Sequence, residues 1–169
     1  YSLSGTDAGL LSINANTGAV TLTGDPDHEN KADYNFNVIA TDAVGNSDTQ
    51  AVTLNINDLD ESDPSITSGA TATAIDENSG AGQVIYTATA TDTADSDDAT
   101  DTSGVLTYSL SGTDAALLSI DANTGAVSLT ADPDHENKAD YSFNVIATDA
   151  AGNSDTQAVS LKINDLDES

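Results

Sequence analysis

Apolar and polar residues alternate with a period of two through the second half of the chain, which is the pattern of half-buried β-strands. It is clearest where Tyr141, Phe143, Val145 and Ala147 occupy every second position. Further predicted strands follow the same rule and lie at 83–91, 106–110, 118–120, 127–129 and 159–163, with a short strand before Glu77. No stretch combines helical spacing with capping residues. The pattern therefore predicts about seven strands and an all-β, antiparallel Greek-key β-sandwich.

Two details of this prediction concern its faces and turns. In the 83–91 strand, the alternation places Val84, Tyr86, Ala88 and Ala90 on one face. The segment 121–125 reads Asp-Ala-Asn-Thr-Gly and is expected to turn, because its glycine accepts a positive φ. Tyr and Phe at alternating positions are interpreted as core residues rather than as ligand-stacking ones.

The chain also repeats itself. Residues 1–62 align without a gap to residues 108–169, and only eight positions differ. A near-identical repeat of this length indicates tandem globular modules. We expect 63–169 to be a complete module with a terminal linker, and 1–62 to be the C-terminal part of a module whose first strands are missing. Such a fragment is not expected to be self-sufficient, since an apolar inner face and a sheet edge would be open.

The charge of the chain excludes several functions. The chain has 29 acidic residues, three lysines and no arginine, which gives a net charge of −26. Nucleic-acid binding needs a basic surface, and an anionic membrane would repel this chain. The absence of cysteine rules out disulfides and thiolate chemistry. A disulfide-free extracellular module needs another form of stabilisation, and bound metal is a common one.

The acidic residues gather in loops that can converge at one end of a sandwich. Calcium takes six to eight oxygen ligands, and so many carboxylates in one place would repel each other without a divalent cation. The spacing typical of EF-hands is absent. The predicted calcium ligands at the junction between the two modules are Asp27, Glu29, Asp58, Leu59, Asp60, Glu61, Asp92 and either Asp95 or Asp97.

Six short motifs, in order, resemble those of a cadherin repeat of the kind found in giant bacterial adhesins of the RTX type, which are exported by type I secretion. They are Ile75-Asp76-Glu77-Asn78, Ala90-Thr91-Asp92, the 121–125 turn, Asp134-His135-Glu136, Ala147-Thr148-Asp149 and the 58–62 linker. The resemblance covers 63–169 and all of 1–62, and it implies cadherin- or immunoglobulin-like sandwiches clamped by calcium. It departs from the family pattern where His135 replaces an arginine and where the linker ends in Glu61 and Ser62.

The resemblance also implies further ligands. Asp149 of the downstream module would reach back to the junction with Asp27, Glu29 and Asp58. A second half-site at the end of the chain would contain Glu77, Asp134, Glu136, Asp165, Asp167 and Glu168.

Other chemistry is disfavoured by the sequence. His28 and His135 are interpreted as structural or exposed residues rather than as zinc ligands, because no second histidine lies within range in a module. No nucleophile motif such as G-x-S-x-G occurs. Asp134 and Glu136 have the residue types of a glycosidase pair, but the chain has no tryptophan to form a sugar platform. We therefore expect no enzymatic activity.

Two functions remain. The first is a calcium-rigidified spacer that projects the ligand-binding region of a large adhesin from a bacterial cell surface, with neighbouring repeats of the same chain as its partners. The second is direct calcium-dependent adhesion to a second copy, to a polysaccharide or to a cell-surface protein. An exposed aromatic patch would favour the second function.

Overall fold

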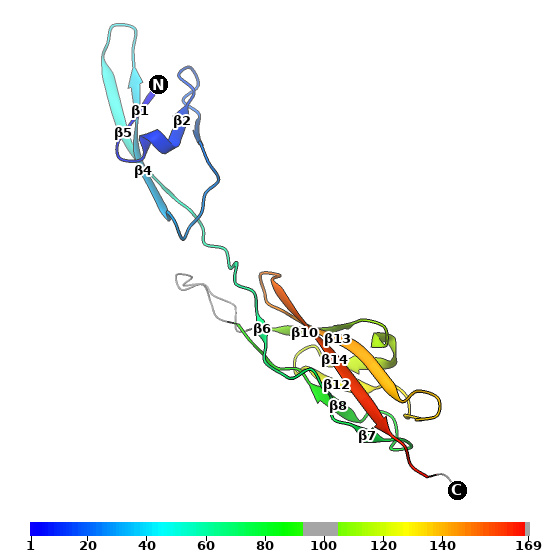
Figure 1. Cartoon of the computed structure of the whole chain (residues 1–169). Helices are drawn as coiled ribbons and strands as arrows, with labels where there is room; N and C mark the ends of the chain where they lie inside the picture. The colour runs from blue at the N-terminus through cyan, green and yellow to red at the C-terminus, as the bar shows by residue number, and fades with distance from the viewer. Residues whose placement is uncertain (93–104, 168–169) are drawn as a thin grey trace. The chain divides into compact units, whose positions relative to one another are not determined.

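The computed structural model describes residues 1–92 and 105–167. The chain divides into two units, Tyr1–Leu59 and Asp60–Ser169, which we call unit 1 and unit 2 (Figure 1). Apart from two single-turn 3-10 helices, the regular structure of both described parts is β-strand. None of the helices in the described part of the chain has the length and apolarity that a membrane crossing requires.

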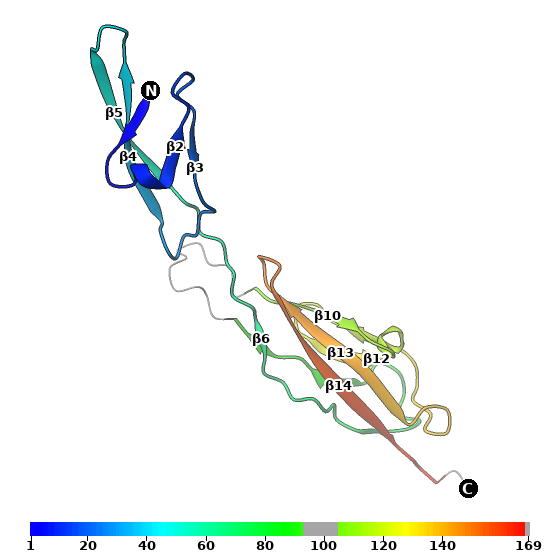
Figure 2. The same ribbon diagram turned by 45° about the horizontal axis from the view of Figure 1, so that its top comes forward.

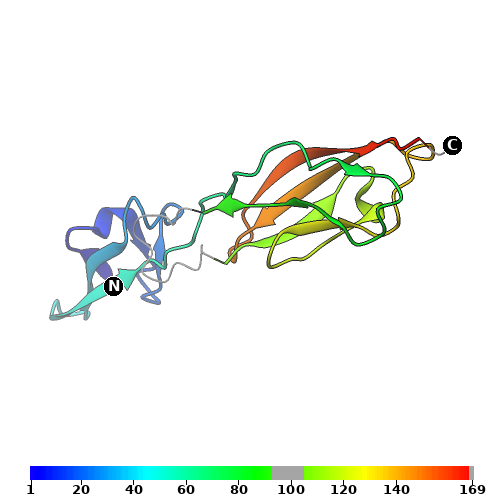
Figure 3. The same ribbon diagram turned by 90° about the horizontal axis from the view of Figure 1, so that it is seen from below.

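Unit 2 is a β-sandwich. Its elements are β6 (Ser65–Ile66), β7 (Ile75–Asp76), β8 (Val84–Thr87), β9 (Ala90–Thr91), β10 (Thr107–Ser111), η2 (Ala115–Leu117), β11 (Leu118–Ile120), β12 (Ala126–Leu129), β13 (Asp140–Thr148) and β14 (Ser154–Asn164). One sheet has the order β10-β13-β14-β7 and another has the order β11-β12-β8, while β6 pairs with β9. Figure 3 shows β13 and β14, in orange and red, lying side by side along the unit. The all-β sandwich predicted from the alternation is confirmed.

The core of unit 2 forms where the inward side chains of the two sheets meet. Phe143, Val145 and Leu161 are at most 1% exposed, and the ring of Tyr86 meets that of Phe143 edge-on at 6.3 Å between centroids. Alternation along β13 and β14 sends every second residue inward, as the sequence predicts. The chain before β8 meets β14 in parallel: the short β7 pairs with the end of β14, and Thr71 forms an isolated parallel bridge with Ser160.

The predicted face of the 83–91 strand is wrong at its first residue. Val84 is 60% exposed, whereas Ile85 and Tyr86 are both buried. The cause is a shift of register against β12, in which Tyr86 pairs with Val127 and Val84 pairs with Ser128. Ile85 is therefore the extra residue of a β-bulge, which places two consecutive side chains in the core. The strand also breaks into β8 and β9 rather than continuing to Thr91.

Unit 1 repeats the later elements of unit 2. Its elements are β1 (Ser2–Ser4), η1 (Ala8–Leu10), β2 (Leu11–Ile13), β3 (Val20–Leu22), β4 (Asp33–Thr41) and β5 (Ser47–Asn55). One sheet has the order β1-β4-β5, and β2 pairs with β3 (Figure 2). The two 3-10 helices, η1 and η2, were not expected from the sequence, because three residues are too few to show a helical period.

The core of unit 1 is more open than that of unit 2. Leu54 is 36% exposed, whereas Leu161, its counterpart in the repeat, is 0% exposed. The same contrast holds for Val20, Leu22, Val52 and Ile56, which are half-buried, against Val127, Leu129, Val159 and Ile163, which are buried. In unit 2, β8 pairs with β12 and Tyr86 packs on Phe143. In unit 1 the corresponding sheet contains only β2 and β3, so these apolar side chains are covered less.

Candidate metal centre

Carboxylates and imidazoles gather in four groups within the described residues. In each group, one potential ligand atom per residue lies within 4.8 Å of the others. The groups are His28–Glu29–Asp58, Asp60–Asp92–Asp149, Glu77–Asp134–Glu136 and His135–Glu136–Asp165. The first belongs to unit 1 and the other three belong to unit 2.

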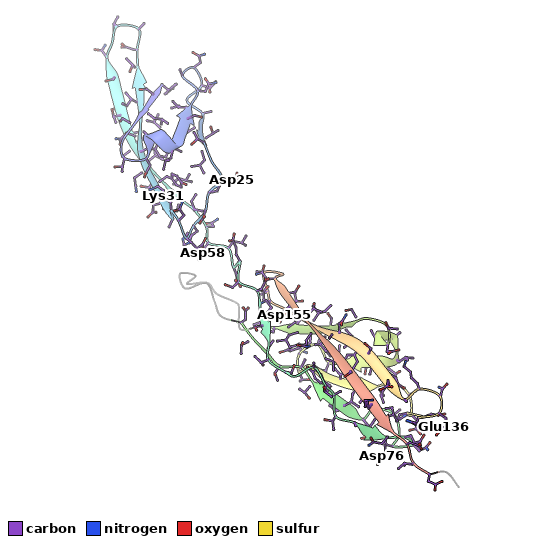
Figure 4. The ribbon with its side chains drawn as sticks, in the orientation of Figure 1. Asp25, Lys31, Asp58, Asp76, Glu136 and Asp155 are labelled. Carbon is purple, nitrogen blue, oxygen red and sulfur yellow. The ribbon has the colours of Figure 1, made fainter. Side chains whose placement is uncertain are left out.

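The His28–Glu29–Asp58 group is built on a tight turn at residues 27–31. The carbonyl oxygen of Asp27 accepts a hydrogen bond from the amide of Lys31 at 2.9 Å, and its carboxylate accepts one from the amide of Asn30 at 3.0 Å. The carboxylate of Asp27 is thus used by the turn itself, which presents His28 and Glu29 toward Asp58. Figure 4 labels Asp58 where the chain leaves unit 1.

The Asp60–Asp92–Asp149 group joins three segments that are distant in the sequence. Asp92 directly follows β9, Asp149 directly follows β13, and Asp60 precedes β6. The side-chain amide of Asn153 donates to the carboxylate of Asp149 at 2.9 Å and to the carbonyl oxygen of Asp60 at 3.0 Å. Asn153 therefore fixes the linker against the turn between β13 and β14.

Asp149 is held as an anion although it is buried. Burial alone would raise the pKa of Asp149, but hydrogen bonds from the Asn153 side chain and from the amides of Gly152 and Asn153 outweigh it and lower the pKa. Asp42 is the counterpart of Asp149 in the turn between β4 and β5 of unit 1, and hydrogen bonds from the side chain and amide of Asn46 lower its pKa. A charged carboxylate prepared in this way is a suitable ligand for a hard cation.

Glu77 organises the opposite end of unit 2. It is 2% exposed, and its two carboxylate oxygens accept hydrogen bonds from the amides of Leu166 at 2.6 Å and His135 at 2.9 Å. These two backbone hydrogen bonds lower the pKa of Glu77 despite its burial. Glu77 thereby fixes both the 134–136 loop and the C-terminal segment, and Figure 4 places Glu136 at this end.

The electrostatics of these groups favour a cation. Two carboxylates 4.8 Å apart repel by about 0.9 kcal/mol in bulk water and by about 3.5 kcal/mol at an effective dielectric constant of 20. The three carboxylates of the Asp60–Asp92–Asp149 group contain three such pairs. The three lysines contact Asp7, Asp114 and Asp140, which lie outside the four groups.

The structure brings together nine of the predicted ligands. Those brought together are Glu29, Asp58, Asp60, Asp92, Asp149, Glu77, Asp134, Glu136 and Asp165. Asp27, Glu61 and Asp167 do not belong to any of the four groups. The predicted role of Leu59 is not tested by these groups, because its side chain has no ligand atom. Asp95, Asp97 and Glu168 lie outside the described residues, so the choice between Asp95 and Asp97 stays open. The ligand roles themselves remain predictions.

Sequence reasoning missed the partners of two lysines. Lys31 contacts Asp7 at 2.9 Å, and Lys138 contacts Asp114 at 2.9 Å. The second oxygen of each aspartate accepts a backbone amide, and these contacts lower the pKa of both Asp7 and Asp114. The available signal was that both lysines recur at the same position of the repeat in a chain that is otherwise almost free of basic residues.

Comparison with known proteins identifies the family. A cadherin domain model matches residues 59–164, and a putative Ig domain model matches residues 8–57. Human protocadherin Fat 4 is 32% identical over 98% of this chain, and human protocadherin-1 is 32% identical over 83% of it. The chain spans only 3% and 13% of these two relatives.

Solved structures support the same fold. The chain is similar to a protocadherin gammaB7 EC3-6 cis-dimer structure, with a TM-score of 0.56 and 22% identity over 97% of this chain and 40% of that one. It is also similar to mouse cadherin-23 EC22-24, with a TM-score of 0.54 and 24% identity over 94% of this chain and 50% of that one. Together with the match of the cadherin domain model, these findings show that the chain belongs to the cadherin domain family.

Proposed function

We propose that this chain is part of a calcium-rigidified spacer, in which Ca²⁺ binds the acidic groups at the ends of the units and stiffens the chain between them. The proposal rests on two of the acidic groups, which have members on either side of Leu59 in the sequence. Asp58 belongs to the unit 1 group and Asp60 to the Asp60–Asp92–Asp149 group, with only Leu59 between them in the sequence. Calcium bound to both groups would restrict rotation about that linker.

The donor set fits calcium. The side-chain ligands of the Asp60–Asp92–Asp149 group are all carboxylates. The backbone carbonyl of Asp60, which accepts a hydrogen bond from Asn153, is a further oxygen in this region. Calcium accepts both kinds of oxygen and binds with dissociation constants of about 10⁻⁴–10⁻³ M in extracellular modules. The residues proposed as ligands here are Asp27, Glu29, Asp58, Leu59, Asp60, Glu61, Asp92 and Asp149, with Asp95 or Asp97 added from outside the described residues.

A second, weaker calcium site is proposed at the far end of unit 2. Its residues are Glu77, Asp134, Glu136, Asp165, Asp167 and Glu168. Glu136 belongs to two of the observed groups, and so one carboxylate can serve two adjacent positions. This site is expected to bind calcium weakly, because the Glu136 and Asp165 side chains are each 63% exposed.

The wider setting is also a proposal. We infer an extracellular location at a bacterial cell surface, within a large RTX-type adhesin, with neighbouring repeats as the main partners and no catalytic role. The near-identity of the repeats supports a spacer, because duplication changes length without changing chemistry. The relatives named above are animal proteins and do not bear on bacterial origin.

Direct calcium-dependent adhesion is the alternative. One similar structure is described as a cis-dimer of protocadherin gammaB7. For this chain, self-association in calcium would appear in analytical ultracentrifugation as a concentration-dependent mass. A monomer that persists at high concentration in calcium would favour the spacer.

The test of calcium binding is thermal unfolding of the whole chain in calcium, in magnesium and in chelator. At ten to a hundred times the dissociation constant, binding to the folded state adds about 1.4–2.7 kcal/mol. For modules of this size that corresponds to a rise of roughly 6–20 °C in melting temperature. Magnesium should have little effect, because it dehydrates reluctantly and prefers strict octahedral geometry.

Matched variants locate the effect. Asp92→Asn and Asp149→Asn each remove one charge from the Asp60–Asp92–Asp149 group, and both should reduce the calcium-dependent rise in melting temperature. Asp140→Asn removes a charge that pairs with exposed Lys162 and is in none of the groups, so it should leave that rise unchanged. Equal melting temperatures of the native chain in calcium and in chelator would reject the proposal.

A further inference from the structure

The unit 1 group contains an imidazole where an oxygen-only calcium site would have none. The Nδ1 atom of His28 lies 3.5 Å from a carboxylate oxygen of Asp58 and 3.7 Å from a carboxylate oxygen of Glu29. These separations are longer than a hydrogen bond between nitrogen and oxygen. One ligand atom from each of the three side chains lies within 4.8 Å of the other two, and no hydrogen bond between described residues reaches His28 Nδ1.

Asp58 is the residue that marks this group as a site. Its side chain is only 10% exposed, and neither carboxylate oxygen accepts a hydrogen bond from any residue in the described ranges. The Nδ1 atom of His28 is likewise buried and makes no hydrogen bond within those ranges. A buried carboxylate without hydrogen bonds is costly, and metal coordination is one of the few ways to compensate it.

The spacing of the ligand atoms suits a small cation with tetrahedral geometry. Zinc binds nitrogen and oxygen at about 2.0–2.1 Å, so two ligand atoms at the tetrahedral angle lie about 3.3 Å apart. The observed 3.5 Å and 3.7 Å need to close by only a few tenths of an ångström. Calcium is larger and takes oxygen ligands, so it leaves the imidazole unused.

We propose that His28, Glu29 and Asp58 form a binding site for a nitrogen-accepting transition-metal dication of the zinc class. His28 coordinates through Nδ1, Asp58 and Glu29 each provide one oxygen, and water completes the shell. This site does not require calcium. Because it shares Glu29 and Asp58 with the proposed calcium ligands, zinc and calcium compete for unit 1.

The repeat provides an internal comparison at His135, Glu136 and Asp165. There the Nδ1 atom of His135 lies 3.8 Å from Glu136 and 3.9 Å from Asp165, and the Asp165 side chain is 63% exposed. The wider spacing and greater exposure make this copy a weaker zinc site. The two histidines are the only ones in the chain, so each can be followed separately.

The experiment is a titration of the whole chain with zinc chloride in calcium-free buffer, followed by calorimetry and by nitrogen-detected NMR of the two imidazoles. His28→Gln and His135→Gln are the matched variants, and each also assigns the remaining imidazole signal. Loss of groups that merely support a metal ligand costs roughly ten- to a hundredfold in affinity. We therefore expect His28→Gln to weaken the tighter zinc site at least tenfold and His135→Gln to leave it within twofold. The Nδ1 signal of His28 should shift before that of His135.

Three results would overturn the proposal. These are an unchanged zinc affinity in His28→Gln, a His28 signal that does not respond to zinc, or a response of both imidazoles at the same zinc concentration. If His28→Gln alters folding, its β4 amide protection will differ from that of the native chain, and the NMR titration of the native chain then decides alone. Calcium competition is read separately, so failure of calcium binding would leave the zinc result intact.

Discussion

Substitution of one leucine in each repeat measures how far the two units differ. Leu161 and Leu54 occupy equivalent positions in β14 and β5, and they are 0% and 36% exposed. Truncating a fully buried leucine to alanine loses about 2 kcal/mol of apolar transfer free energy. A residual cavity adds about 1–3 kcal/mol. Leu161→Ala should therefore lower the free energy of unfolding of unit 2 by about 3–5 kcal/mol.

Leu54→Ala should cost less. With 36% of the side chain already in water, about 1.3 kcal/mol of the transfer term remains, and an open site leaves little cavity. Amide hydrogen exchange with mass spectrometry gives each value separately, because Asn35/Ser142 and Thr53/Ser160 give the matching strand peptides of the two repeats different masses. Equal losses in the two variants would refute the account.

Three further predictions follow from particular contacts. First, Lys138 and the amide of Ser142 lower the pKa of Asp114, so the folded state binds fewer protons at this carboxylate than the unfolded state does. The stability that results is present above about pH 4 and is lost as the pH falls further. Asp114→Asn should therefore reduce the loss of unfolding free energy at acid pH, as measured by urea titrations at successive pH values. Second, Gly125→Ala should destabilise unit 2 by at least about 1–2 kcal/mol, because φ is +69° and the new Cβ would lie 2.5 Å from the carbonyl oxygen of Ala88. Its matched control, Gly18→Ala in unit 1, has a similar φ but meets only the Tyr1 ring at 3.3 Å, so a larger loss there in hydrogen exchange would contradict the packing argument. Third, Asp58→Ala should loosen the linker in calcium while β4 and β5 in unit 1 and β13 and β14 in unit 2 keep their amide protection. Loss of that protection in saturating calcium would show that Asp58 is needed for folding.

The sequence was sufficient for the strands that obey simple alternation. In β13 and β14, inward positions recur every second residue, and no bulge disturbs them. Alternation failed at Val84, because a bulge depends on how β8 aligns with β12, which is a long-range property. The parallel pairing of β7 has the same origin, since two residues carry no signal of their direction.

The candidate site was predicted in the same partial way. Residue type and loop position were enough to nominate Asp60 and Asp92. Asp149 was nominated only by the resemblance to cadherin repeats, and the structure places it with Asp60 and Asp92. The role of Asn153 in joining two of them was not visible, because asparagine after a turn is ordinary. The burial of Asp58 beside His28 was also missed, because a single histidine in each module gives no spacing pattern from which to infer a ligand.

Small-angle X-ray scattering of the whole chain, in calcium and in chelator, measures whether calcium stiffens the chain. We expect calcium to narrow the distribution of overall dimensions and chelator to broaden it. In calcium, Asp92→Asn should resemble the chelated state and Asp140→Asn should resemble the native chain. Scattering curves that superimpose in calcium and in chelator, while calorimetry shows calcium bound, would contradict this expectation.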